Sequence, residues 1–129
     1  GATIEEIEPV LSADELTALQ ALVRRIPAPP SLVEASVRLA RATRPTDGEA
    51  PEFIRRMVAW GAGPRASQYL VLAAKARAAL DGRPIPDLDD VRAVAPDVLR
   101  HRVVPGFEAE ASGRSADDLI DELVQAILV

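Results

Sequence analysis

The sequence predicts an all-α domain, a compact bundle of about six helices. Three observations lead to this fold class. Aromatic residues make up only 3% of a chain that is 48% apolar, so Leu, Val, Ile and Ala supply the core, which suits helix-on-helix packing. Helix-capping patterns stand ahead of several segments with apolar residues at helical spacing. Prolines and glycines separate these segments by short connections, as in a bundle.

The bulk composition narrows the class of protein. A length of 129 residues suits one compact domain and is too short for two large ones. A formal charge of −5 disfavours a nucleic-acid partner, because proteins that bind nucleic acid usually carry a basic excess. No window is apolar enough to span a bilayer, so no membrane span is expected. The lack of Cys rules out disulfides and thiolate chemistry and favours a cytoplasmic location.

The N-terminal third is expected to hold a tail and two helices. Residues 1–11 mix apolar and acidic side chains and are expected to be a tail or linker that docks through its apolar residues. The sequence leaves open whether this tail packs on this domain or belongs to a domain that precedes it. Because the chain opens on Gly and not Met, we expect a piece of a longer protein. Ser12 and Glu15 form a capping box ahead of a first helix over 13–25. Prolines within 27–30 end this helix and open the second.

A short third helix is expected over 50–60, and the fourth is the longest. Pro64 has the fixed φ that suits a first helical position, and Gly82 stands where a C-terminal glycine belongs. At 100° per residue one broad face of this helix contains Ala66, Tyr69, Leu70, Ala73, Ala76 and Leu80. Because three of these six are alanine, another helix can approach closely. We therefore expect this face to be buried and the helix to be central.

The C-terminal third predicts two more capped helices. Asp87 caps the fifth helix, with Asp90 at its N3 position. Pro96 breaks or kinks this helix, and a separate short helix is expected over 96–101. A minimal two-strand patch is expected near Ile85 and Val103. The stretch 107–113 is expected to be a loop. Ser115, with Asp118 three residues on, then caps the last helix.

Arg65 is an unusual residue type for the first turn of the fourth helix. A cation there faces the positive end of the helix dipole, which is unfavourable. One interpretation is an exposed arginine whose aliphatic stem covers apolar neighbours. The other is a cation held beside free helix N–H groups so that both face an anion such as phosphate. The chemistry of the residues leaves both interpretations open.

Motifs for complete catalytic sites are missing. One His and no Cys are too few for a metal site, so none is expected. G-x-S-x-G, H-E-x-x-H, G-x-G-x-x-G and the Walker A pattern G-x-x-x-x-G-K-[ST] are all absent. We therefore do not expect the chain alone to be a nucleotide-hydrolysing enzyme.

Six short strings are weak singly but specific in their order and spacing. They are A-T-R-P at 42–45, G-A-G-P-R-A at 61–66, A-A-K-A-R-A at 73–78, D-G-R at 81–83, D-D-V at 89–91 and V-L-R-H-R at 98–102. This succession resembles the C-terminal helical lid of MoxR-type AAA+ ATPases, and the match covers about residues 10–128. Gly63 departs from the family pattern, since it stands where the family has serine.

The resemblance implies a fragment whose chemistry is shared with another domain. Residues 12–129 would be the lid, and an α/β nucleotide-binding domain with Walker A and Walker B would precede it. Arg65 matches the family's sensor 2 arginine, which reaches the γ-phosphate of ATP, and it is the one catalytic candidate, acting only in the intact ATPase. Gly63 and Pro64 accompany it as cofactor-binding candidates. Arg44 and Arg83 are secondary candidates near the nucleotide or a subunit boundary.

The resemblance also implies cofactors and partners. The full-length protein would use ATP and Mg²⁺, and none is expected for the chain alone. Its partners would be its own N-terminal ATPase domain, neighbouring subunits of a hexameric ring and a von Willebrand factor A domain protein. The function implied is ATP sensing, ATP hydrolysis and ring assembly for chaperone-like remodelling, with Arg65 serving its own or a neighbour's site. The alternative is a stand-alone helical protein-interaction module with an apolar groove for a partner helix.

Overall fold

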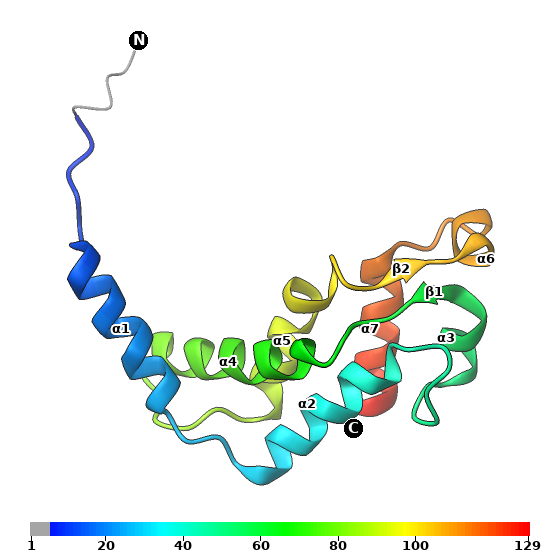
Figure 1. The fold of residues 1–129 in the computed structure, drawn as a ribbon, viewed down its shortest axis with the longest axis horizontal. Coiled ribbons are helices and arrows are strands. Elements are labelled where there is room, and N and C mark those ends of the chain that lie inside the picture. The colour runs from blue at the N-terminus through cyan, green and yellow to red at the C-terminus, as the bar shows by residue number, and fades with distance from the viewer. Residues whose placement is uncertain (1–5) are drawn as a thin grey trace.

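The computed structural model describes residues 6–129, and it is mostly helical (Figure 1). Its elements are α1 Ala13–Arg25, α2 Pro30–Ala42, α3 Glu52–Met57, β1 Val58–Trp60, α4 Arg65–Leu80, α5 Leu88–Leu99, β2 Val104–Pro105, α6 Phe107–Ala111 and α7 Ala116–Ile127. The predicted all-α class is confirmed, with seven helices in the described part of the chain and one small two-stranded sheet.

Three capping boxes start their helices where the sequence predicts. In α1 the Ser12 hydroxyl accepts from the Glu15 N–H, and the Glu15 carboxylate accepts from the Ser12 N–H, both at 3.1 Å. The same reciprocal pairs begin α5 at Asp87 and α7 at Ser115. The hydrogen bond from the Ser12 backbone N–H also lowers the pKa of the Glu15 carboxyl. The helix over 13–25 has the predicted bounds.

Helix α4 lies at the centre of the fold, where it packs against α1, α2 and α5 (Figure 1). Its buried stripe is Ala66, Leu70, Ala74 and Ala78. The predicted face is therefore partly wrong, because the Tyr69 side chain is 41% exposed and Leu80 is 91% exposed. A helix this rich in alanine has little difference between its faces, so its neighbours decide which stripe they cover.

Helix α5 runs through Pro96 to Leu99, so the predicted separate helix over 96–101 is wrong. A proline inside a helix removes one backbone hydrogen bond. Ala95 and Leu99, on either side of it, are both fully buried. Burial of these side chains against the core outweighs the lost bond and keeps the helix continuous.

The small sheet has a different partner strand from the predicted one. β1 pairs antiparallel with β2, with Val58 opposite Pro105 and Trp60 opposite Val104. The Met57 carbonyl also accepts a hydrogen bond of 2.7 Å from the Gly106 N–H. The predicted third helix over 50–60 therefore ends at Met57, and the predicted pairing near Ile85 is wrong.

The stretch predicted as a loop over 107–113 contains the short helix α6, so this prediction is wrong. Ala109 in this helix is fully buried, which anchors it to the core. Gly113 ends the stretch with a φ of 74°, a left-handed conformation that glycine adopts without strain.

The described part of the predicted tail does not dock on the bundle. Ile7 is 74% exposed and Val10 is 93% exposed, and the segment before α1 leads away from the helices (Figure 1). Ile4 lies outside the described residues. Docking through apolar side chains is therefore wrong for residues 6–11 within this chain, whereas the boundary after residue 11 stays a prediction.

Candidate functional site

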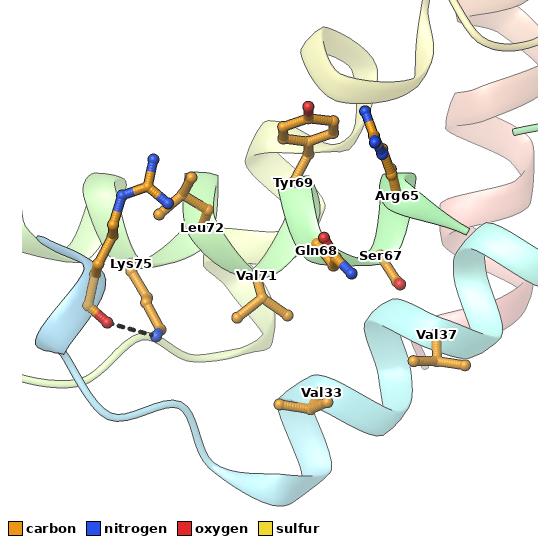
Figure 2. A pocket seen from close by; sticks show the side chains of 10 residues that line it. Val33, Val37, Arg65, Ser67, Gln68, Tyr69, Val71, Leu72 and Lys75 are labelled. Atoms are coloured by element: carbon orange, nitrogen blue, oxygen red, sulfur yellow. Dashed lines mark hydrogen bonds between the residues drawn. The ribbon is translucent and has the colours of Figure 1, made fainter. Parts of the chain in front are cut away.

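Arg65 is the first residue of α4 and is exposed, as are Gly63 and Pro64 just before it. None of the ion pairs within residues 6–129 includes Arg65. Figure 2 shows its side chain and that of Tyr69 on the same side of α4, pointing away from α2. The guanidinium is therefore exposed and has no ion-pair partner within residues 6–129.

A hydrogen-bonded clamp holds the loop that leads into Arg65. The buried Thr43 hydroxyl accepts from the Ala62 N–H at 2.9 Å and donates to the Ala40 carbonyl at 2.6 Å. The Arg44 Nε donates to the Ala62 carbonyl at 2.7 Å. Both backbone polar groups of Ala62 are thus bound by the end of α2. The strings A-T-R-P and G-A-G-P-R-A therefore meet in space.

The two glycines of this loop have different roles. A Cβ on Gly61 would lie 2.4 Å from the Thr43 carbonyl oxygen, so only glycine permits this close approach. A Cβ on Gly63 would meet nothing within 4 Å, so a serine would fit there. The departure of Gly63 from the family pattern therefore leaves the loop's packing unchanged.

The start of α4 has no side-chain cap. Pro64 precedes Arg65 with helical dihedrals of φ −61° and ψ −28°, as its predicted position requires. The Gly63 carbonyl accepts from the Ala66 N–H at 3.1 Å, which closes the first turn. Arg65 is thus held on a regular helical turn at the end of a clamped loop.

Both secondary arginine candidates are engaged within the fold. Arg44 holds the Ala62 carbonyl, as described above. Arg83 binds the buried Asp90 carboxylate through two hydrogen bonds of 2.8 and 2.5 Å, and it also binds Asp81 at 2.7 Å. Neither guanidinium is free to leave its partners without breaking these bonds. Arg44 holds the loop before Arg65, whereas Arg83 lies beyond the opposite end of α4. Both side chains are less exposed than that of Arg65.

Asp90 is a buried carboxylate that joins the end of α4 to the start of α5. It accepts from Arg83, from Arg77 at 2.6 Å and from the Asp87 N–H at 2.8 Å. The hydrogen bonds from Arg83 hold the pKa of the Asp90 carboxyl well below its usual range, against the opposing effect of burial. Sequence reasoning assigned Asp90 to a helix cap alone. The available sequence signal for a further role was the position of Asp90 between strings that contain arginine.

A groove of about 730 Å³ lies between α1, α2 and α4, and Arg65 lines it (Figure 2). Its other charged lining residues are Arg24 and Lys75, and no Asp or Glu lines it. The Lys75 ammonium donates to the Arg24 carbonyl at 3.2 Å, which ties α4 to the end of α1. Beside the groove, the Arg102 guanidinium lies 4.9 Å from the centroid of the Tyr69 ring.

The family model for the AAA lid domain matches residues 52–123, more than half of the chain. The chain belongs to the AAA lid domain family. The matched segment includes α4 with Arg65, the Asp90 cluster and most of α7. The fold described above is therefore that of an AAA lid domain.

Relatives of this AAA lid domain include MoxR proteins. Chaperone MoxR1 of Mycobacterium tuberculosis is 34% identical over 98% of this chain and 34% of its own length. Protein YeaC of Bacillus subtilis is 32% identical over 98% of this chain and 37% of its own length. Protein MoxR of Methylorubrum extorquens is 38% identical over 56% of this chain. The lid domain thus spans about a third of the length of the first two relatives.

A solved structure has the same fold. The crystal structure of a proposed ATPase from Cytophaga hutchinsonii superposes with a TM-score of 0.83 and 27% identity. The match covers 93% of the lid domain and 36% of the other chain. The predicted resemblance to the lid of MoxR-type AAA+ ATPases is confirmed.

Within residues 6–129 no three His, Cys, Asp or Glu side chains are grouped to hold a metal ion. In the same range, no helix combines the length and apolarity needed to cross a membrane. His101, the one histidine of the sequence, is exposed at the end of α5.

Proposed function

We propose that this chain is the sensor 2 lid of a MoxR-type AAA+ ATPase and that Arg65 contacts the γ-phosphate of ATP. The supporting observation is an exposed guanidinium with no carboxylate partner in residues 6–129, held at the start of a helix whose preceding loop is clamped by Thr43 and Arg44. Most other arginines of residues 6–129 are bound to carboxylates or carbonyls. Arg24 and Arg25 of α1 share the exposure of Arg65, but neither stands at the start of a helix behind a clamped loop.

The chemistry of arginine suits this role. A guanidinium is planar and always charged, and it can grip a phosphate through two parallel hydrogen bonds. It also stabilises the charge that builds on a transferring phosphoryl group. Because Arg65 is attached to a rigid helix, its movement would follow that of the whole lid. Loss of the γ-phosphate would then change how the lid sits on its neighbouring domain.

ATP and Mg²⁺ are the cofactors proposed for the full-length protein. Arg65 would supply one phosphate contact, and residues 6–129 hold no group of three His, Cys, Asp or Glu side chains for a metal ion. The phosphate cradle and the metal ligands must therefore come from another domain. That fits a chain that covers about a third of its relatives. Gly63 and Pro64 would approach the nucleotide only through their backbone.

The partners proposed are the protein's own N-terminal ATPase domain and neighbouring subunits of a hexameric ring. A von Willebrand factor A domain protein would act alongside this ring in chaperone-like remodelling. We place the complex in the cytoplasm, which a sequence without Cys favours. A Walker A motif in the reading frame upstream of Gly1 would support the lid over a stand-alone interaction module.

The decisive experiment is substitution of Arg65 in the intact ATPase. Arg65→Ala should lower ATP turnover about tenfold or more, because one charge partner of the transition state is lost. Arg65→Lys should recover only part of the rate, because lysine keeps the positive charge but lacks the paired N–H donors of the guanidinium. Arg25→Ala is the matched control, because Arg25 is also exposed and outside the ion pairs. Unchanged turnover in Arg65→Ala would remove Arg65 from the site.

A further inference from the structure

The groove between α1, α2 and α4 has two chemically different walls. Helix α2 contributes only valines to its lining, and Val33 and Val37 remain 39% and 40% exposed. The α1 and α4 side contributes all three of its cations, Arg24, Arg65 and Lys75. No carboxylate lines the groove in a protein whose net charge is −5. An occupant with one acidic and one apolar side would complement both walls.

The segment from Glu6 to Leu11 has this two-sided pattern. Its sequence alternates Glu6, Ile7, Glu8, Pro9 and Val10, and all of these residues are exposed. In an extended chain, successive side chains point to opposite sides. Glu6 and Glu8 therefore share one side with Val10, and Ile7, Pro9 and Leu11 share the other. Residues 7–9 have no regular secondary structure, and residues 10 and 11 form only a bend. The segment can therefore extend once Glu6 leaves its 3₁₀ conformation.

The lengths of the segment and the groove also agree. Ser67 and Lys75, which both line the groove, are eight residues apart on α4, which is about 12 Å along a helix. An extended chain from Glu6 to Val10 covers about 13 Å. The segment would therefore lie along most of the groove.

The segment does not reach the groove of the same chain with Glu8 beside the cations of that groove. It joins the chain at the N-terminal end of α1, whereas Arg24 lies near the other end of that 13-residue helix. Folding back along α1, a distance of about 18 Å, would use up the whole segment before Glu8 reached the groove. In Figure 1 the segment leads away from α2 and α4, two of the helices that line the groove. A second copy of the chain meets the requirement without this fold-back.

We propose that the Glu6–Leu11 segment of one copy binds the groove of a second copy. Glu6 and Glu8 face Arg24 and Lys75 of that copy, and Ile7 lies against Val33 and Val37. The contact joins two different surfaces, so repetition produces a ring or a filament and not a closed dimer. This inference rests on the ring assembly within the proposed function and makes no use of the phosphate contact of Arg65.

Sedimentation of the 129-residue chain over a range of concentrations tests the proposal. The average mass should rise above that of the monomer, and added salt should weaken the association. Glu8→Lys should weaken it about tenfold or more, because like charges then face each other. Glu110→Lys, an exposed glutamate on α6 with no ion pair in the described fold, should leave it unchanged. A chain that stays monomeric up to millimolar concentration contradicts the proposal.

A charge swap identifies the occupant. Arg24→Glu should weaken association as Glu8→Lys does, and the two changes together should restore it. Arg25→Glu is the control, because Arg25 lies outside this groove on the same helix. Association that persists at full strength in Glu8→Lys would assign the groove to another occupant and overturn the proposal. Neither result depends on ATP turnover in Arg65→Ala, so the two proposals fail separately.

Discussion

The Thr43 hydroxyl and the Ala62 N–H are joined by a 2.9 Å hydrogen bond across 19 residues of chain. Thr43 ends α2, and Ala62 lies three residues before Arg65. The bond is buried, so both groups have left water and depend on each other. The orientation of the exposed Arg65 is thus coupled to a buried contact.

Thr43→Val should lower the free energy of unfolding by about 1–3 kcal/mol, because the buried Ala62 N–H loses its acceptor while the volume is kept. Urea unfolding measures this. Thr17→Val is the matched control, since Thr17 is an exposed helical threonine whose hydroxyl donates one turn back. Equal unfolding midpoints for the two variants would show that the clamp adds no stability.

Gly61→Ala should destabilise the domain more than any other glycine-to-alanine change in this loop. The new methyl group would lie 2.4 Å from the Thr43 carbonyl oxygen, so the backbone of the clamp must shift. Gly63→Ala meets nothing within 4 Å and should be neutral or stabilising by up to about 1 kcal/mol. Thermal unfolding of both variants checks the contrast. A similar melting temperature for the two would contradict the close approach.

Asp90→Asn should lower the free energy of unfolding by about 3 kcal/mol at pH 7, because Arg77 and Arg83 lose a buried charge partner. The folded-state pKa of Asp90 is lowered, so its contribution is complete above the unfolded pKa of about 3.9 and is lost as pH falls further. Urea unfolding at pH 7 and near pH 3 should show a smaller difference between wild type and variant at the lower pH.

Asp89→Asn is the control for this series, because Asp89 is exposed and its single ion pair with Arg92 lies at the surface. Exposed pairs contribute about 0–1 kcal/mol. If Asp89→Asn costs as much as Asp90→Asn, burial of the carboxylate is not the source of its stability.

The chain alone should bind ATP only weakly. One guanidinium and a helix start provide a single phosphate contact, and the remaining phosphates would stay in water. Calorimetric titration of ATP into the 129-residue chain should show no micromolar binding. Micromolar affinity would mean that these residues hold a nucleotide site without a second domain.

Local signals predicted the capped helices well. Each capping box at Ser12, Asp87 and Ser115 is a contact between residues three apart, so it can be read from a few letters. The bounds of α1 and the start of α7 follow from this. Interactions between residues close in the sequence alone decide these features.

Features that depend on distant parts of the chain were predicted poorly. β1 pairs with a strand more than forty residues away, and three residues are too short to show a strand pattern. The buried stripe of α4 was misplaced because alanines occupy several of its faces. The clamp at Ala62 was missed because nothing local links Thr43 to it. The strings of the family pattern include Thr43 and Ala62, but they do not show that these two residues are hydrogen-bonded to each other.

The position of Arg65 in the intact ATPase with a bound, non-hydrolysable ATP analogue tests the central claim most directly. A crystal or cryo-EM structure should place its guanidinium about 2.7–3.0 Å from an oxygen of the γ-phosphate. Under the proposal, that phosphate belongs either to the same subunit or to its neighbour. Arg65 in solvent, or bound to a protein carboxylate with the γ-phosphate in place, would contradict it.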